Sequence, residues 1–279
     1  MGSDTRGTVL MIHGAFCASW CFDNFAEVFS ARGFACEAPD LRHHQTGLEP
    51  QPDAEASVSS LNDYVSDIEG RIRKMDELPI LIGHSMGGLI AQKLAAKGLA
   101  RALILLSAAA PWGILPSTED EIAAATGLMS AGPFWTHWLK PSFEVASGNA
   151  LVKLDDKAKR AVFDKFCSES GQALFEMFFW MFDHGRAAAV DTAAVTCPVL
   201  MVFGSDDKVI SARTGWQIAH RYGERATIHE AAGHGHMLLI EPGWERIAER
   251  CADWAARQAD AKAKSLGRNR SRTKAKAKV

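Results

Sequence analysis

Apolar runs alternate with amphipathic stretches along the first 110 residues of the chain, and again after residue 193. Short runs rich in Val, Ile and Leu predict buried strands, at 8–14, 34–41, 78–85, 102–110, 198–204 and 226–231. Apolar residues at helical spacing predict helices between and after them, at 20–33, 60–75, 86–98, 211–222 and 241–258. Continuous apolar strands that alternate with helices are typical of a parallel sheet covered on both faces, so we predict an α/β fold.

The alternation stops at residues 111–192, where no run predicts a convincing strand. Helical spacing instead predicts several helices, at about 118–130, 134–149, 155–167 and 170–184. We therefore expect a core in two parts, 1–110 and 193–260, with 111–192 inserted between them as a helical cap.

Basic residues gather at the carboxyl end of the chain. The 279 residues include 31 Lys and Arg against 33 Asp and Glu, and residues 262–278 hold eight of the basic residues and no acid. A like-charged, low-complexity end is typical of a solvated tail, so we expect 261–279 to be disordered. The tail has no aromatic residue for base stacking, and we expect no specific nucleic-acid partner.

Several classes of protein are excluded by what the chain lacks. No apolar run reaches the ~18–20 residues of a membrane span, and the N-terminus lacks the apolar segment of a signal peptide. We expect a cytoplasmic protein whose six cysteines are reduced and mostly buried. Neither a dinucleotide fingerprint nor a metal-ligand array is present, so we expect no cofactor and no metal. The oligomeric state stays open, with a homodimer as one option.

Three glycines surround one serine in the stretch LIGHSMGGLI, residues 81–90. Gly83 and Gly87 stand two residues to either side of Ser85, between a predicted strand and a predicted helix. A Gly-x-Ser-x-Gly turn in that context is typical of a nucleophile elbow, in which glycines leave room for a strained serine. We predict that Ser85 is a nucleophile; the alternative is a glycine-rich turn with an incidental serine.

A serine hydroxyl is a poor nucleophile, so it needs a base, and the base needs an orienting acid. In the expected chain order the acid follows the serine and the histidine comes last. Asp207, just after the strand at 198–204, is our candidate acid, while its neighbour Asp206 is interpreted as a solvated acid or helix cap. His236, after the last predicted strand, is our candidate base, and His234 stays open as the alternative.

The reaction also creates a negatively charged oxygen that needs hydrogen-bond donors. One backbone N–H is expected from Met86, directly after the nucleophile, and the other from the loop after the first strand, HGAF at 13–16. An ordinary strand-end turn is the alternative interpretation of His13 and Gly14.

Together these residues resemble the α/β-hydrolase superfamily over about 1–110 and 195–258. The early segment IHGAFCASWCF is similar to the branch that holds plant methyl-salicylate esterases and hydroxynitrile lyases, and to many bacterial carboxylesterases. The resemblance implies the N–H of Ala15 as the second oxyanion donor, with Phe16 pointing into the pocket or packing under it. One departure is DLRHHQTG at 40–47, where two histidines replace a glycine-rich turn and either line the mouth of the site or lie on the surface.

A serine at the elbow, in place of the aspartate of dehalogenases and epoxide hydrolases, favours acyl transfer. The segment 111–192 holds half of the eight tryptophans and is expected to roof an apolar pocket. We predict a small-molecule substrate, a small or medium apolar or aromatic carboxylic ester. The residues expected to contact it are Phe16, His84, Trp112, Trp138 and Phe179.

Two other functions stay open. A lyase or carbon–carbon hydrolase would use the same three residues, and in the similar hydroxynitrile lyases a cap lysine takes part, for which Lys140, Lys153 and Lys157 are candidates by region only. A non-catalytic ligand receptor on this fold would retain the same residues, so only turnover distinguishes it from an enzyme.

Overall fold

The computed structural model describes residues 5–44 and 58–276, with side chains described through residue 260. Six parallel strands form the central sheet in the order β2-β1-β3-β4-β7-β8. Their bounds are β1 Thr8–Ile12, β2 Ala35–Glu37, β3 Ile80–His84, β4 Ala102–Leu106, β7 Val199–Gly204 and β8 Ala226–Ala231. Each strand lies inside a run that the sequence predicted, so the predicted α/β fold with a parallel sheet is confirmed.

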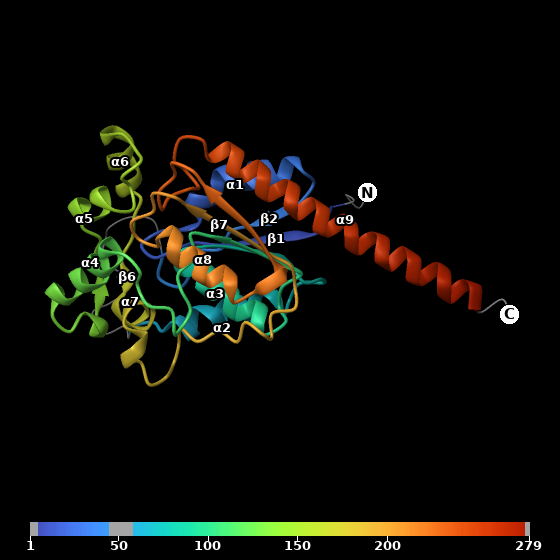
Figure 1. Ribbon diagram of the computed structural model, residues 1–279, viewed down its shortest axis with the longest axis horizontal. Helices are drawn as coiled ribbons and strands as arrows, with labels where there is room; N and C mark the ends of the chain where they lie inside the picture. Colours follow the sequence, from blue (N-terminus) through green and yellow to red (C-terminus); the bar gives the residue numbers. More distant parts are fainter. Residues whose placement is uncertain (1–4, 45–57, 277–279) are drawn as a thin grey trace.

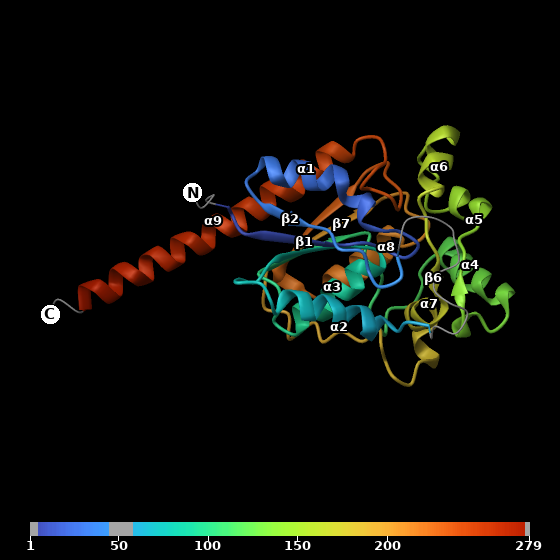
Figure 2. The ribbon, with the colours of Figure 1, turned by 180° about the vertical axis from the view of Figure 1, so that it is seen from behind.

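Helices cover both faces of this sheet (Figures 1 and 2). Their bounds are α1 Asp23–Ala31, α2 Leu61–Ile72, α3 Met86–Ala96, α8 Ala212–His220 and α9 Trp244–Lys276. In β1, Leu10 belongs to the core formed with α2, α3 and α8, whereas Met11 belongs to the core formed with α1 and α9. Because neighbouring residues of a strand point to opposite faces, a strand buried on both sides is apolar throughout.

Between β4 and β7 the chain leaves the sheet and forms the inserted segment, residues 111–192. Its elements are α4 Glu119–Gly127, η2 Leu128–Ala131, η3 Phe134–Thr136, β5 Trp138–Leu139, α5 Phe143–Gly148, α6 Asp156–Phe163, β6 Glu169–Ser170, α7 Gly171–Phe178 and η4 Trp180–Phe182. Figures 1 and 2 show α4 to α7 gathered at one end of the sheet. That end is the carboxyl end of the strands, because the loop after β1 contacts residues 167–169 there.

The expected helix at 134–149 is replaced by η3, β5 and α5, and β5 pairs with β6 in an antiparallel ladder. The sequence predicts no strand in this segment, and this prediction is wrong for β5 and β6. Pro141 disfavours a continuous helix, because its ring clashes with the preceding turn and it lacks an N–H. The partner strand comes from residues about 30 positions away, which local spacing does not reveal.

The carboxyl-terminal helix is longer than its pattern predicted. It was expected to end near residue 258, but α9 runs to Lys276 and projects beyond the sheet, through residues expected to be disordered (Figure 1). Alanine, lysine and arginine are strong helix formers, so the composition that suggested a solvated tail also favours a helix.

Other features of the described residues bear on the expected class of protein. All six cysteines are free thiols, and five of them are buried, as expected. In the part of the chain that the structure describes, no helix has both the length and the apolar character needed to cross a membrane. The same residues form no group of three or more His, Cys, Asp or Glu side chains that would hold a metal ion. The cytoplasmic location stays a prediction.

A buried hydrogen bond between Tyr222 and Gln92 joins α3 to the end of α8. The Tyr222 hydroxyl donates to Gln92 Oε1 (2.8 Å), and Gln92 Nε2 donates to the Ala109 carbonyl (3.3 Å). Replacing Tyr222 with Phe leaves a buried amide oxygen without its donor, which costs about 1–3 kcal/mol. We therefore expect Tyr222→Phe to lower the free energy of unfolding by that amount in urea titrations, with an unchanged dependence on urea. An unchanged midpoint would contradict this role for the hydroxyl.

Candidate active site

Ser85 stands at the turn between β3 and α3 in a conformation that L-residues rarely adopt. Its φ is 51° and its ψ is −121°, which for a residue with a side chain stores strain. The turn is tight: a Cβ at Gly83 would lie 2.3 Å from the Gly87 carbonyl oxygen, and one at Gly87 would lie 2.1 Å from the Ile12 carbonyl oxygen. Glycine at both positions therefore allows the turn that presents Ser85.

Asp207 and His236 form a buried hydrogen-bonded pair after β7 and β8. His236 Nδ1 lies 2.9 Å from Asp207 Oδ2 and 3.2 Å from Oδ1. The carboxylate is held in turn by the backbone N–H groups of Val209 and Ile210, which donate to Oδ1 at 2.8 and 2.9 Å. Because an ionised carboxylate only accepts, Nδ1 carries the proton, and Nε2 is left with the lone pair that a general base needs.

The loop that carries His236 is fixed from two sides. His84 Nε2 donates to the His236 carbonyl at 2.9 Å, with the two ring centres 4.9 Å apart. The buried Glu241 accepts from the N–H of Gly235 (2.7 Å) and of Met237 (2.9 Å), one residue before and one after the histidine. No hydrogen bond joins Ser85 Oγ to His236 among the described residues; in free enzymes such contacts commonly tighten only when substrate binds.

The alternative base, His234, and the alternative acid, Asp206, have partners other than Asp207 and His236. His234 Nδ1 lies 3.5 Å from Glu241 Oε2. Asp206 is half exposed and pairs with Lys153 of the inserted segment, and this ion pair lowers the pKa of its carboxyl. The structure therefore brings Asp207 to His236, and neither Asp206 nor His234 joins that pair.

The two backbone N–H groups expected for the oxyanion lie beside the elbow. A Cβ at Gly14, directly before Ala15, would lie only 2.9 Å from Ser85 Cβ, so the loop after β1 packs against the serine. Met86 begins α3, and the first N–H groups of a helix have no partner within it. Within the described residues, the N–H groups of Ala15 and Met86 donate to no protein acceptor.

Comparison with known proteins identifies the family. A family model described as serine aminopeptidase, S33, matches residues 3–243. The chain belongs to this family. It is a carboxylesterase-like α/β-hydrolase, as the resemblance of its motifs implied.

Similar proteins include hydrolases of esters and lipids. The chain is 26% identical over 263 residues to a pyrethroid hydrolase of Sphingobium wenxiniae, covering 90% of this chain and 89% of that one. Among solved structures it is similar to a monoacylglycerol lipase of Paleococcus ferrophilus, with a TM-score of 0.69, 20% identity and coverage of 92% and 97%. A methylesterase from Arabidopsis is similar with a TM-score of 0.64, 14% identity and coverage of 88% and 99%. These two structural likenesses establish the fold alone.

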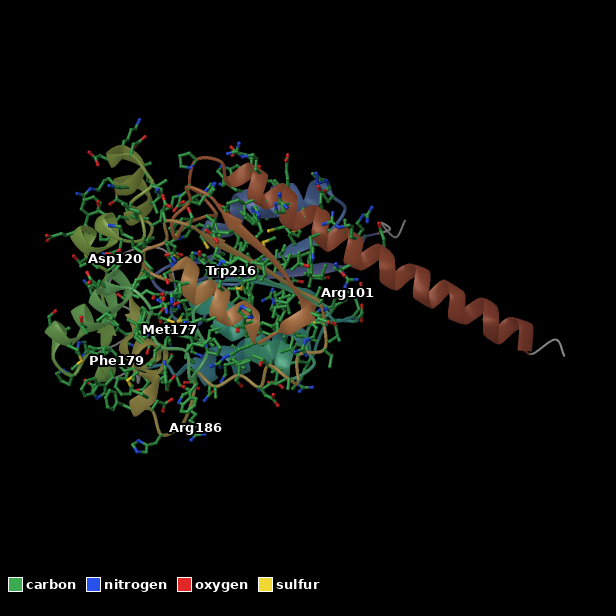
Figure 3. The ribbon with its side chains drawn as sticks, in the orientation of Figure 1. Arg101, Asp120, Met177, Phe179, Arg186 and Trp216 are labelled. Atoms are coloured by element: carbon green, nitrogen blue, oxygen red, sulfur yellow. The ribbon has the colours of Figure 1, made fainter. Side chains whose placement is uncertain are left out.

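The aromatic residues expected to contact substrate are held in three different clusters. Trp112 packs against Trp180, with ring centres 4.9 Å apart, and lies under the Arg186 guanidinium at 4.8 Å. Trp138 of β5 packs edge-on against His43 at 5.3 Å. Phe179 packs against other phenylalanines inside the inserted segment, where Figure 3 shows it near Met177.

The two other expected contacts are in or beside the site. Phe16 is half-buried, has a φ of 62°, and packs against both hydrophobic cores. His84 is 1% exposed and binds the histidine loop, so its observed contact is one that supports His236. Burial lowers the pKa of His84 to about 3, and it does the same for His13, so both rings are neutral.

A mainly apolar cavity of about 40 Å³ is lined by residues that bind Ser85 and Asp207, although neither of these two residues lines it. Its lining includes Ala109, whose N–H donates to the Ser85 carbonyl (2.9 Å), and Val209, whose N–H binds Asp207. On the other side it is lined by Met177, Phe178 and Trp180 of the inserted segment. None of the five residues expected to contact substrate lines this cavity, although Trp112 packs against Trp180, which does. Helical spacing does not reveal which way a short, broken helix faces.

The structure also shows a buried polar cluster that the sequence did not predict. Glu169 of β6 accepts from His44 Nε2 (2.8 Å) and from the Tyr64 hydroxyl (2.8 Å), and all three side chains are buried. His44, one of the two histidines that depart from the family pattern, thus lies inside the protein, whereas His43 contacts Trp138. Residues 45–47 of that departure are outside the described residues. No local signal marks Glu169, because its partners His44 and Tyr64 come from segments more than 100 residues away.

His44 and Glu169 each stabilise the charged form of the other. Burial disfavours the charged imidazole, but the carboxylate charge and hydrogen bond of Glu169 outweigh it and raise the pKa of His44. Burial likewise disfavours the carboxylate, but His44 outweighs it and lowers the pKa of Glu169. The contribution of His44 to the free energy of unfolding is therefore complete below its ordinary pKa of 6.5, and it is lost as the pH rises through the raised pKa of His44 in the folded protein. Stabilisation by Glu169 is complete above 4.5 and is lost as the pH falls through the lowered value.

We therefore expect His44→Gln to cost more stability at about pH 6 than at about pH 10, since the wild-type imidazolium is lost in between. Urea unfolding of both proteins at the two pH values measures the difference. The exposed His137, replaced by Gln, is the matched control and is expected to show no such dependence. An equal cost of His44→Gln at both pH values would contradict a charged pair.

Proposed function

We propose that this chain is a serine carboxylesterase that cleaves small or medium apolar or aromatic esters through an acyl-enzyme on Ser85. The observation that carries the proposal is the buried Asp207–His236 pair next to a serine held in a strained turn. The N–H groups of Ala15 and Met86, which have no protein acceptor among the described residues, complete the set of groups that acyl transfer needs.

In the first step, Ser85 Oγ attacks the ester carbonyl carbon while His236 Nε2 removes the hydroxyl proton. Asp207 stabilises the imidazolium that forms and keeps the ring oriented. The tetrahedral intermediate collapses when His236 returns the proton to the leaving alcohol. A water molecule then attacks the acyl-enzyme, His236 takes one of its protons, and the carboxylic acid leaves as Ser85 recovers its hydrogen.

The oxyanion of each tetrahedral intermediate is expected to accept hydrogen bonds from Ala15 and Met86. Met86 stands at the N-terminus of α3, where the helix dipole adds partial positive charge to its N–H. Removing one such donor typically lowers kcat by about 10²–10³-fold. The loop that carries Ala15 is therefore expected to contribute as much to kcat as the helix that begins with Met86.

The surroundings of the serine support an apolar substrate group. The residues that hold Ser85 and Asp207 in place, Ala109 and Val209, face a small, mainly apolar cavity, and such surroundings favour a substrate group without charge. The similarity to a pyrethroid hydrolase makes pyrethroids sensible test compounds beside simple esters.

The lyase alternative gains no support from the three candidate lysines. Lys153 pairs with Asp206 beside the histidine loop, and Lys140 and Lys157 are exposed. The receptor alternative is tested by turnover.

We expect wild-type protein to hydrolyse p-nitrophenyl esters and to react with a fluorophosphonate probe, and Ser85→Ala to lose both. Removing the nucleophile eliminates the acyl-enzyme, so the remaining rate is expected to be at least about 10³-fold lower. The chain-length optimum of the esters measures the size of the pocket. Unchanged turnover in Ser85→Ala would contradict the nucleophile, and labelling without turnover of any ester would favour the receptor.

Matched substitutions distinguish the roles of His234 and His236. His236→Gln removes the base that faces Asp207, and we expect kcat/KM to fall by at least about 10²-fold, within the range of general-base contributions. His234→Gln removes a ring that faces Glu241, and we expect a change of less than about threefold. Steady-state hydrolysis of one p-nitrophenyl ester measures both, and a larger loss in His234→Gln would reverse the assignment.

A further inference from the structure

The buried cluster around Glu169 is attached to the loop that carries Ala15. Glu169 Oε2 accepts from the backbone N–H of Phe16 (3.4 Å) as well as from His44. Its other oxygen, Oε1, accepts from the Tyr64 hydroxyl and from the N–H of Ser170, each at 2.8 Å. Four donors thus converge on one carboxylate, and one of them belongs to the residue directly after Ala15.

Two further contacts bind the same short segment to the same loop. The N–H of Cys167 donates to the Phe16 carbonyl (3.0 Å), and the Cys167 thiol donates to the Cys17 carbonyl (3.3 Å). Phe16 is therefore held through both its N–H and its C=O by residues 167–169. This matters because Phe16 has a φ of 62°, which costs energy for a residue with a side chain and persists only where the surroundings enforce it.

The segment is itself anchored, so it is able to hold the loop. Ser170 Oγ donates to the Ser59 carbonyl (2.6 Å), and β6 pairs with β5. His44 has an acceptor at each ring nitrogen, the Arg42 carbonyl (2.9 Å) and Glu169 Oε2, so both nitrogens carry hydrogen. The imidazolium neutralises the carboxylate, which would otherwise repel an oxyanion forming near Ala15.

We infer that Glu169 is a positioning residue for catalysis: it fixes the loop at Phe16 so that the N–H of Ala15 points at the developing oxyanion. The inserted segment then supplies part of the support of the oxyanion hole, beyond any contact with substrate. This inference rests on the proposed esterase function.

The test is Glu169→Gln in the full-length protein. A glutamine has a single acceptor oxygen, so it cannot accept from four donors, and Phe16 loses its fixed partner. Small displacements of a catalytic group cost up to about 10² in rate. We expect kcat for a p-nitrophenyl ester to fall about 10- to 100-fold, with KM changed less than about threefold, because the oxyanion forms only on the way to the transition state.

Inhibition by an alkyl trifluoromethyl ketone gives a second readout. Such a ketone forms a hemiketal with Ser85, whose oxygen occupies the oxyanion hole and mimics the transition state. The inhibition constant is expected to rise by about the same factor as kcat falls. A purely structural role would lower the melting temperature without this parallel change.

Glu176→Gln is the matched control. Glu176 on α7 is also a buried glutamate of the inserted segment, and it accepts from the N–H of Leu61 (2.7 Å) and the Ser60 hydroxyl (2.9 Å). It thus joins the segment to α2, and within the described part of the chain it forms no hydrogen bond with the loop after β1. We expect it to lose stability while kcat and the inhibition constant stay within about twofold of wild type.

Three outcomes decide the inference. Equal kcat and inhibition constants in Glu169→Gln and Glu176→Gln, with Ser85→Ala inactive, overturn the role of Glu169 and leave the esterase intact. Turnover that persists in Ser85→Ala overturns the proposed function itself. If Glu169→Gln does not fold, Tyr64→Phe removes one donor to the same carboxylate, and a parallel two- to tenfold change in kcat and inhibition constant supports the inference, whereas no change overturns it.

Discussion

The site depends on how closely the turn between β3 and α3 approaches the end of β1. Gly87 lies against the carbonyl oxygens of Ile12 and His13, and Gly14 lies against the Cβ of Ser85. These backbone approaches bring a strained serine, the start of a helix and the loop after β1 to one point at the carboxyl end of the sheet. In open parallel sheets, ligands bind at such strand ends, because there the loops meet and the helices present their N-termini.

His13, His44 and Glu169 are buried near this point, and each of their side chains has defined hydrogen-bond partners. His13 donates to the Gly14 carbonyl and accepts from the N–H of Leu41, so it is satisfied as a neutral ring. His44 and Glu169 are satisfied as an ion pair. The difference follows from the acceptors available: one acceptor and one donor select a neutral imidazole, whereas two acceptors select the charged form. Such clusters specify one arrangement of the loops, since a lost partner leaves a costly unpaired group.

The inserted segment contacts the core through polar groups as well as through apolar packing. Lys153 pairs with Asp206 beside the histidine loop, Glu176 caps the start of α2, and Glu169 holds the loop after β1. Each contact joins a residue of the segment to a loop or helix end near the carboxyl side of the sheet. The segment therefore helps to hold the geometry of the elements below it. Its aromatic side chains Phe134, Phe175 and Phe179 pack together and join the core that contains α2, α3 and α8.

The sequence by itself determined the succession of strands and helices along the core parts of the chain, because continuous apolar runs and helical spacing are local properties. It also determined the elbow at Ser85, since only glycines fit the positions on either side, and the order of acid and histidine that follows from the fold. The sequence also favoured Asp207 over Asp206 and His236 over His234, but the hydrogen bond between Asp207 and His236 became visible only in the tertiary structure, which pairs two loops 29 residues apart. The same holds for the β5–β6 ladder, for the residues that line the cavity, and above all for Glu169. Its partners His44, Tyr64 and Phe16 come from the first quarter of the chain, and contacts between such distant segments leave no periodic pattern in the sequence.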